Sequence, residues 1–388
     1  MDKHTVINFL NKNKDKWENK TPCFVVDKSG LTDIIRKVKS SLMGEIVYSH
    51  KTNPDNGILE VILAEGCGLL ISSVEEMEEV ARKEKYEQGK IIFQSPSLTR
   101  EQYKKIRQFG VTCFSADSIQ QLEILLEDIA RGTFLEVLVR INTGVKVPDA
   151  ELPYSSDSFL GFHISEAKPI FDKLNILRKQ NKIKLGIHSH LLSQNTFIDV
   201  WKKNFNLIVD FVGKLKKDGI MLDTIDFGGG YPVAYHNAVP EVSDIAEAIK
   251  APCDKIRSYY PNIKFVFEPG RKLVAEVVTL VTKVTQTKTF LKEKVAILNC
   301  SLYNGALDTL IVGLYLPVEK IGFKPNEKNF ELESYFIRGC TPDSLDVFSK
   351  GVKLPSLNND DFLAFLYAGA YSFSSDFISL KKPTYILI

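Results

Sequence analysis

The fold is decided by a strand–helix–strand stretch that begins with KLGIHSH (184–190) and ends with TIDFGGG (224–230). Between these two runs, residues 201–219 repeat apolar side chains at helical spacing and stop at Gly219, a residue typical of helix C-termini. The alternation extends outward to VLVRIN (137–142) and KFVFEPG (264–270). Strand–helix repetition over about 230 residues predicts a parallel sheet closed into an eight-stranded α/β barrel.

Two helices of this predicted barrel have a well-defined apolar face. In SIQQLEILLEDIAR (118–131), Ser118 is placed as an N-cap, and in residues 201–219 the apolar positions recur every three or four residues. We expect the core faces to consist of Ile119, Leu122, Leu125 and Ile129 in the first helix and of Trp201, Phe205, Ile208, Val212 and Leu215 in the second.

After residue 275 the pattern changes to β-branched and aromatic runs joined by polar loops. These runs include VVTLVTKV (277–284) and PTYILI (383–388), which predict strands. We therefore expect a barrel over residues 28–274 and an antiparallel β domain over residues 275–388, joined by the strand-like TPCFVVD (21–27) from residues 1–27.

Composition excludes several function classes. Fifty basic and 48 acidic residues leave a net charge of +2 over 388 residues, so no basic surface for nucleic acid is indicated. No apolar run reaches the ~20 residues that span a bilayer, and the lysine-rich N-terminal segment does not resemble a signal peptide. The six cysteines form no CxxC pair, which excludes a zinc or disulfide framework. We expect a cytoplasmic protein that acts on small molecules.

Polar clusters follow four predicted barrel strands, at the end where barrels carry active sites. Lys51 follows the apolar run IVYSH, and burial at a strand end would suit it to bind an aldehyde. An exposed lysine at a strand exit is the plainer alternative. Glu268 ends another apolar strand and needs a buried partner, which could be a protonated heterocyclic nitrogen or the nearby Arg271.

The other two clusters are HSHLLSQ (188–194) and DFGGGYP (226–232). His188 and His190 share one face of a strand, where they could pack in the core, bind a metal or stack on an aromatic cofactor. Three consecutive glycines, Gly228 to Gly230, could form a phosphate cradle or a tight turn. Taken together, the four clusters supply what pyridoxal phosphate needs: a lysine, a ring-stacking imidazole, a phosphate cradle and a carboxylate.

The order of the motifs carries a family resemblance. Along the chain stand TPCFVVD (21–27), YSHKTNP (48–54), HSHLLSQ (188–194), DFGGGYP (226–232), FEPGR (267–271), CTPDSLD (340–346) and YAGAY (367–371). In this order they resemble the fold-type III pyridoxal-phosphate decarboxylases, the group of diaminopimelate, ornithine and arginine decarboxylases.

The resemblance implies an alanine-racemase-like barrel with a β domain, and it assigns roles to matching residues. Lys51 would bind the aldehyde of pyridoxal phosphate, His190 would stack on its ring, and Glu268 would keep its pyridine nitrogen protonated. The implied phosphate site consists of Ser193, Gly228, Gly229, Gly230, Gly270, Arg271 and Tyr371. Family members are homodimers with shared active sites, so Cys340 and Asp343 would act in the partner's site, on reprotonation and on the substrate respectively.

The chain departs from the family pattern near the expected substrate. The family segment GP-x-C-D/E-S-x-D corresponds to RGCTPDSLD (338–346), where direct alignment puts Pro342 at the cysteine position and a two-residue shift restores Cys340. We favour Cys340 as the displaced equivalent. Leu192 stands where glycine is usual, Leu70 where aspartate is common, and Phe377-Ile378 replaces Phe-Asn. These changes favour an atypical substrate.

The expected function is decarboxylation of an amino acid, such as a diamino acid or an amino-acid conjugate, to an amine and carbon dioxide. Arg338 is a candidate for a carboxylate on the substrate, and Asp308 for a distal amine. Two alternatives stay open: a regulatory homologue without turnover, favoured by the altered segment 338–346, and an amino-acid racemase. Glu268 disfavours the racemase, because racemases of the alanine type place an arginine at the pyridine nitrogen.

Overall fold

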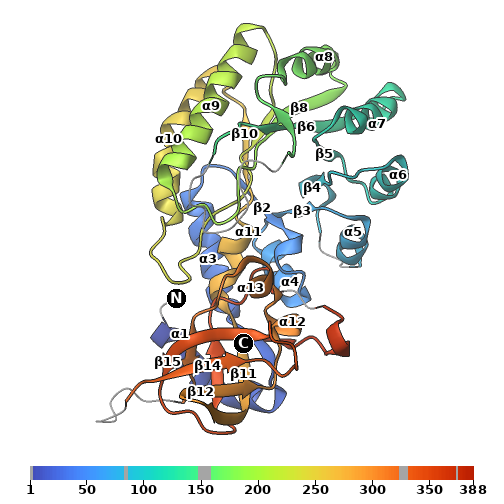
Figure 1. The fold of residues 1–388 in the computed structure, drawn as a ribbon. Coiled ribbons are helices and arrows are strands. Elements are labelled where there is room, and N and C mark those ends of the chain that lie inside the picture. The colour runs from blue at the N-terminus through green and yellow to red at the C-terminus, as the bar shows by residue number, and fades with distance from the viewer. Residues whose placement is uncertain (1–2, 83–85, 147–158, 323–330, 373–374) are drawn as a thin grey trace.

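The computed structural model describes residues 3–82, 86–146, 159–322, 331–372 and 375–388. Figure 1 shows two parts, a barrel with its surrounding helices and a β domain that contains both ends of the chain. In the described ranges, no helix is long and apolar enough to cross a membrane.

Eight parallel strands form the barrel, and pairing of β5 with β6 closes it. Each apolar run of the sequence analysis is one of these strands, because residues buried on both faces need no polar alternation. A ninth strand, β7 (Phe162–His163), extends the sheet beside β6. The barrel strands are β2 (Glu45–Ser49), β3 (Gly68–Ile71), β4 (Ile91–Gln94), β5 (Cys113–Ala116), β6 (Leu135–Asn142), β8 (Ile183–His188), β9 (Thr224–Asp226) and β10 (Lys264–Phe267).

Helices surround the barrel and pack their apolar faces on the strands. They are α3 (Lys28–Ser41), α4 (Asn56–Ala64), α5 (Val74–Ala81), α6 (Arg100–Gln108), α7 (Ile119–Ala130), α8 (Lys168–Lys179), α9 (Ile198–Lys217) and α10 (Val242–Tyr259). In α9 all five predicted core residues are buried, and Gly219 follows the helix with φ +71°. In α7 the Ser118 side chain accepts a hydrogen bond from the Gln121 N–H, as predicted. Ile119 is half exposed and was wrongly placed in the core; Ile124 is buried in the same helix.

The β domain is built from a single sheet in the order β13-β16-β11-β12-β14-β15, with β1 paired to β11 and β17 paired to β1. Its strands are β1 (Cys23–Val26), β11 (Val278–Phe290), β12 (Glu293–Leu298), β13 (Val318–Lys320), β14 (Glu333–Arg338), β15 (Val347–Leu354), β16 (Phe362–Phe365) and β17 (Thr384–Leu387). The strand from TPCFVVD pairs antiparallel with β11, as predicted.

The β domain is not purely antiparallel, because β12 pairs parallel with β14 and β1 pairs parallel with β17. Parallel neighbours need a long connection, and the chain between β12 and β14 includes α12 (Leu302–Gly305) and α13 (Leu307–Val312). At the N-terminus, α1 (Lys3–Lys12) and α2 (Lys14–Trp17) pack against this domain through Leu10 and Trp17.

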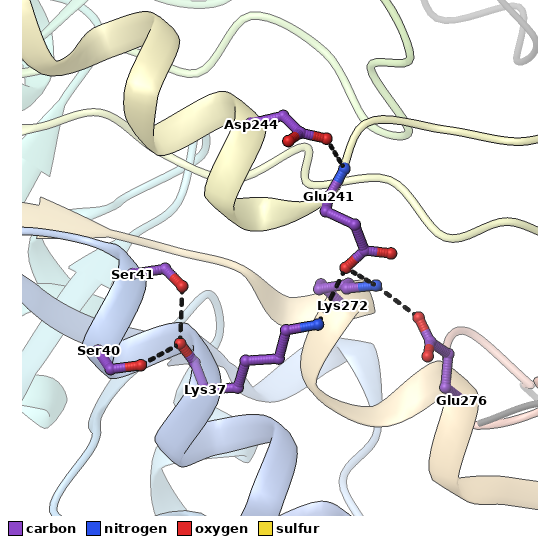
Figure 2. Close-up of polar contacts among 7 residues, drawn as sticks. All are labelled: Lys37, Ser40, Ser41, Glu241, Asp244, Lys272 and Glu276. Carbon is purple, nitrogen blue, oxygen red and sulfur yellow. Dashed lines mark hydrogen bonds and ion pairs between the residues drawn. The ribbon is translucent and has the colours of Figure 1, made fainter.

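A short helix, α11 (Gly270–Val274), connects the last barrel strand to the β domain. Figure 2 shows the ion pairs on its outer side. The buried Lys272 lies 2.6 Å from Glu276 and 3.9 Å from Glu241, which in turn lies 3.2 Å from Lys37 of α3. These contacts fix α11 against its neighbours, so that the preceding residue, Arg271, faces the barrel mouth.

Candidate active site

A cavity of about 370 Å³ opens at the carboxyl ends of the barrel strands. This is the end at which α/β barrels carry their active sites. Its described lining comes from seven barrel strands or the segments that follow them, and from one loop of the β domain. The lining residues are Ser49, Lys51, Leu70, Ser72, Gln94, Pro96, Arg140, Leu160, His190, Leu191, Leu192, Ser193, Gly229, Gly230, Glu268, Gly270, Arg271 and Tyr371.

Lys51 lies in the single turn η2 (His50–Thr52) that follows β2. Hydrogen bonds hold this turn in place: Tyr48 Oη donates to the Asn53 carbonyl (3.0 Å), and Asn53 Nδ2 donates to the Gly369 carbonyl (2.8 Å). The Lys51 side chain is exposed to the cavity. The burial that the sequence suggested for it is therefore absent, and its amine is free to meet a ligand.

His190 lies in the loop after β8, with its ring at the cavity wall. Its Nδ1 accepts a hydrogen bond from the Gly229 N–H at 3.0 Å. Burial, helped by the cations of Arg140 and Lys51, lowers the pKa of His190 to about 3. The ring is therefore neutral at physiological pH, and a neutral flat ring can stack on a positively charged heterocycle without repulsion.

The three glycines after β9 form a tight cradle. Gly228 and Gly230 have φ of +67° and +102°, and a Cβ on Gly228 would lie 2.7 Å from the Ser189 carbonyl oxygen. A Cβ on Gly229 or Gly230 would also collide with backbone atoms. Only glycine allows this approach. The N–H groups of Gly228 and Gly229 bond to Asp226 Oδ1 and His190 Nδ1, and among the described residues no acceptor is found for the Gly230 N–H, which an anion could use. The stacking of Phe227 on Phe205, with ring centroids 4.3 Å apart, supports the strand and contributes about 1 kcal/mol.

Glu268 lies directly after β10 and is buried together with Asp226 and His188. One ligand atom from each of these three side chains lies within 4.8 Å of the other two. Burial first, then the charge of Asp226, raises the pKa of Glu268 well above its usual value, and burial also raises the pKa of Asp226. Two buried carboxyl groups side by side resist carrying a negative charge at the same time, and a positive charge beside Glu268 would favour its carboxylate form.

Arg271 of α11 stands at the other side of the cavity from Arg140's strand and is almost fully buried. Its Nη1 donates to Tyr235 Oη (2.9 Å), and its guanidinium lies 4.8 Å from the ring centre of Tyr371. Asp308 lies 3.6 Å from Arg271, so the described contact of Asp308 is with this arginine. The Tyr371 N–H donates to the Thr52 carbonyl (2.8 Å), which ties the YAGAY segment to the Lys51 turn.

The cavity fits pyridoxal phosphate by its own chemistry. Glu268 Oε1 is buried, and no N–H of a described residue reaches it; His188 Nε2 remains 4.0 Å away. A protonated ring nitrogen would supply the missing donor. The glycine cradle and Arg271 suit a phosphate, and Lys51 offers an amine for an aldehyde.

Five of the predicted residues are not among the described lining residues: Gly228, which precedes the lining residue Gly229, Asp308, which lies 3.6 Å from Arg271, and three residues of the β domain. Cys340, Asp343 and Arg338 belong to the β domain, and none of them is among the described lining residues. Cys340 is exposed, while the Asp343 carboxylate accepts hydrogen bonds from Tyr303 Oη (2.8 Å) and the Leu345 N–H (2.8 Å). The Arg338 guanidinium donates to the Asp343 carbonyl. The fold of one chain therefore brings the cofactor ligands together but not these three residues.

Two residues of the site were missed at the sequence level. Asp226 is the first residue of DFGGGYP, of which only the glycines were predicted to belong to the site. Its Oδ1 accepts a hydrogen bond from the Gly228 N–H at 2.9 Å. Arg140 is a lone charge in the apolar run VLVRIN and lines the cavity. A single charged residue in a strand buried on both faces is a usable signal, because its charge must be satisfied somewhere.

A family model described as "Pyridoxal-dependent decarboxylase, pyridoxal binding domain" matches residues 31–275. Among curated proteins, a diaminopimelate decarboxylase of Zymomonas mobilis is 26% identical over 90% of this chain and 83% of its own length. An L-glutamyl-[BtrI acyl-carrier protein] decarboxylase of Niallia circulans is also 26% identical, over 95% of this chain and 88% of its own length.

Solved structures agree on the fold. A diaminopimelate decarboxylase of M. jannaschii in complex with L-lysine superposes with a TM-score of 0.85 at 23% identity, covering 99% of this chain and 89% of its own. A lysine/ornithine decarboxylase of Vibrio vulnificus in complex with putrescine gives 0.81 at 23% identity, covering 98% of both chains. The predicted class, a barrel with a C-terminal β domain, is confirmed.

Proposed function

Because the chain belongs to the pyridoxal-dependent decarboxylases, we propose that it binds pyridoxal phosphate in the barrel cavity and releases the α-carboxyl group of an amino acid as carbon dioxide. One observation supports this most strongly. The groups proposed to hold the cofactor come from four separate parts of the sequence and line one cavity: Lys51, His190, Gly229 with Gly230, and Glu268 with Arg271. A protein that had lost turnover would not need all of these groups in place.

Each side chain has a task that follows from its position. Lys51 would hold the cofactor through its aldehyde, and its Nζ, exposed to the cavity, could carry a proton to or from the reacting carbon. Glu268 holds a proton at the pyridine nitrogen, and the neutral His190 ring keeps the heterocycle flat against the wall. When bound, pyridoxal phosphate supplies a pyridinium ring that accepts the electron pair left by the departing carboxylate.

The phosphate is held by backbone and by charge. Of the three glycine N–H groups, those of Gly228 and Gly229 bond to Asp226 and His190, so the Gly230 N–H is the one left for the phosphate. Arg271 lines the same cavity, with Ser193, Gly270 and Tyr371. The Gln194 side chain bonds to both backbone groups of Val233, at 2.6 Å and 3.0 Å, and so ties the Ser193 loop to the glycine loop. These groups bind and orient the cofactor and take no part in the bond that breaks.

We also propose a homodimer, with the cofactor in the barrel of residues 28–274 and the β domain of residues 275–388 facing the partner's cavity. The exposed Cys340 and the Asp343 and Arg338 side chains lie outside their own cavity, as a residue that serves the partner subunit must. In this arrangement Cys340 would return a proton to the product and Asp343 would contact the substrate.

The cofactor assignment is tested by reducing the protein with borohydride after incubation with pyridoxal phosphate and mapping its peptides. We expect a pyridoxyl group on Lys51, and recovery of unmodified Lys51 peptide from yellow, cofactor-loaded protein would exclude the assignment. The dimer is tested by mixing two variants, Lys51→Ala and Cys340→Ala. Shared sites predict that the mixture recovers activity up to about a quarter of wild type, since heterodimers keep one intact site. A mixture no more active than its components contradicts shared sites.

A further inference from the structure

Arg271 is a buried cation whose guanidinium has different surroundings on its two sides. Its side chain is 6% exposed and reaches the cavity from α11. On one side, Nη1 donates to Tyr235 Oη at 2.9 Å and lies 3.6 Å from Asp308 Oδ2. On the other side, Nε is buried and finds no hydrogen-bond partner among the described residues. The protein therefore satisfies one side of the guanidinium and leaves the other for a ligand.

The two contacts of Nη1 lie behind the cavity wall. Tyr235 is 5% exposed and lies in the loop that follows β9, and Asp308 lies in α13 of the β domain. Neither is among the described lining residues. Burial raises the pKa of Tyr235 although Arg271 opposes this, so its hydroxyl stays neutral and accepts the Nη1 proton. Both residues hold the guanidinium without reaching the space in which a ligand would lie.

Aromatic rings restrict the guanidinium further. Its carbon lies 4.8 Å from the ring centre of Tyr371 and 5.8 Å from that of Tyr235. The rings of Tyr235 and Tyr367 meet edge to face, with their centres 6.1 Å apart. A long side chain loses conformational entropy when it is fixed, and contacts that fix it before a ligand arrives reduce this loss on binding. Arg271 is therefore held in one orientation before any anion enters.

Tyr235 also connects Arg271 to the rest of the proposed phosphate site. It belongs to the loop that carries Gly230, and its N–H donates to the Val233 carbonyl at 3.0 Å. The side chain of Gln194, in the loop after β8, bonds to both backbone groups of Val233. The Tyr235 hydroxyl thus links two loops of the phosphate site to the helix that carries Arg271.

We propose that Tyr235 is a positioning residue for the cofactor. Together with Asp308 it fixes Nη1 of Arg271, so that the Nε side of the guanidinium faces the phosphate of pyridoxal phosphate. This inference rests on the proposed function. Because neither Tyr235 nor Asp308 lines the cavity, their effect reaches the cofactor only through Arg271.

A purely structural role for Tyr235 makes a different prediction. A buried hydroxyl that only stabilises the fold would, when removed, weaken the binding of every form of the cofactor to the same degree. A hydroxyl that positions Arg271 acts on the phosphate alone. Pyridoxal has the ring and the aldehyde but lacks the phosphate, so a comparison of pyridoxal with pyridoxal phosphate separates the two roles.

The first experiment is an absorbance titration of the cofactor-free protein with pyridoxal phosphate and with pyridoxal. We expect Tyr235→Phe to weaken the binding of pyridoxal phosphate about tenfold, the effect of one lost hydrogen bond to a charged group. The dissociation constant for pyridoxal should change by less than about twofold. Equal losses for the two compounds, or no loss for either, overturn the proposal.

Tyr260→Phe is the matched control for this titration. It removes another buried tyrosine hydroxyl, which donates to the Ile220 carbonyl at 2.7 Å, and neither residue is among the described lining residues. This variant should bind both compounds as wild type does. A tenfold loss of pyridoxal phosphate affinity in Tyr260→Phe would show that any lost buried hydroxyl has this effect, and the proposal would fail.

A double-mutant cycle shows whether Tyr235 acts through Arg271. In Arg271→Met, the further change Tyr235→Phe should lower pyridoxal phosphate affinity by less than about twofold, because the group that it positions is gone. A full tenfold loss in that background would overturn the proposal.

Asp308→Leu tests the second contact of Nη1. It should weaken pyridoxal phosphate about threefold, since its ion pair is longer and its side chain is 18% exposed, and leave pyridoxal unchanged. A gain in pyridoxal phosphate affinity would show that Asp308 repels the phosphate, which contradicts its part in the proposal. If Tyr235→Phe does not fold, as thermal unfolding would show, Asp308→Leu provides the same comparison of the two compounds.

Wild type separates this inference from the proposed function. If wild type binds pyridoxal phosphate and Tyr235→Phe binds it equally well, only the positioning role fails. If wild type binds neither compound, or binds pyridoxal phosphate no more tightly than pyridoxal, the phosphate site is wrong and both proposals fail.

Discussion

Replacing His190 by phenylalanine keeps a flat ring at the cavity wall and removes the group that titrates. The folded protein lowers the pKa of His190 to about 3 because the ring is buried near Arg140 and Lys51. An unfolded chain binds the same proton at about pH 6.5. His190 therefore favours the unfolded state as the pH falls from about 6.5 towards 3, and above pH 6.5 this term vanishes.

The size of the effect follows from the distance between the two pKa values. pH 5 lies about 1.5 pH units below the pKa of His190 in the unfolded chain. At about 1.36 kcal/mol per pH unit, proton binding then stabilises the unfolded state by at most about 2 kcal/mol. The ring is partly open to the cavity, so we expect roughly 1–2 kcal/mol. The loss of the acceptor for the Gly229 N–H lowers the stability of the variant by about 1 kcal/mol at every pH.

The assay is urea unfolding of the cofactor-free protein at pH 7, 6 and 5. Between pH 7 and pH 5, wild type should lose roughly 1–2 kcal/mol more than His190→Phe. The exposed His163 offers a control, since His163→Phe should keep the wild-type pH dependence. Parallel losses in wild type and His190→Phe would show that His190 titrates normally, and the argument for a neutral stacking ring would fail.

The remaining predictions concern the Glu268 carboxylate at the ring nitrogen, the glycine cradle after β9, and α11, the helix that carries Arg271. Glu268→Gln should lower kcat about 100-fold and change the absorbance of bound pyridoxal phosphate, because an amide cannot hold a proton at the ring nitrogen as a carboxylate does; unchanged kcat would remove Glu268 from the mechanism. Gly230→Ala, at φ +102°, should weaken cofactor binding and lower stability by about 1–3 kcal/mol, measured by titration and thermal unfolding; wild-type values would refute the cradle. Lys272→Met removes the amine that lies 2.6 Å from the partly buried Glu276 carboxylate and should lower stability by about 2 kcal/mol, with part of it restored in Lys272→Met/Glu276→Leu; equal stability of the single variant and wild type contradicts this.

Local patterns in the sequence were sufficient for most of the fold. The barrel strands are apolar runs and their helices have regular apolar faces, because both elements must bury a surface that repeats at short range. Ile119 failed this test because it is the first residue of α7, where the end of a helix can extend past the strand on which the helix packs. The mixed pairing in the β domain was missed because strand order depends on contacts between distant parts of the chain, such as β1 with β17.

The site residues divide in the same way, into those that local sequence marks and those that only contacts between distant segments reveal. Lys51, the glycine cradle and Glu268 are marked by their own neighbours in sequence, and they do line one cavity. The roles of Asp226 and Arg140 become visible only in the assembled barrel: Asp226 lies beside Glu268, which follows β10, and Arg140 lines the cavity. Exposure within a cavity, as for the Lys51 amine, is likewise a property of the assembled barrel.

The central claim is tested most directly by carbon dioxide release from carboxyl-labelled amino acids, with 2-aminoadipate and diaminopimelate beside lysine and ornithine. The cofactor-loaded wild-type protein should release label from C1 of at least one of them, and Lys51→Ala, loaded in the same way, should release none above background. Absence of release from the whole panel, or equal release from wild type and Lys51→Ala, would contradict the account.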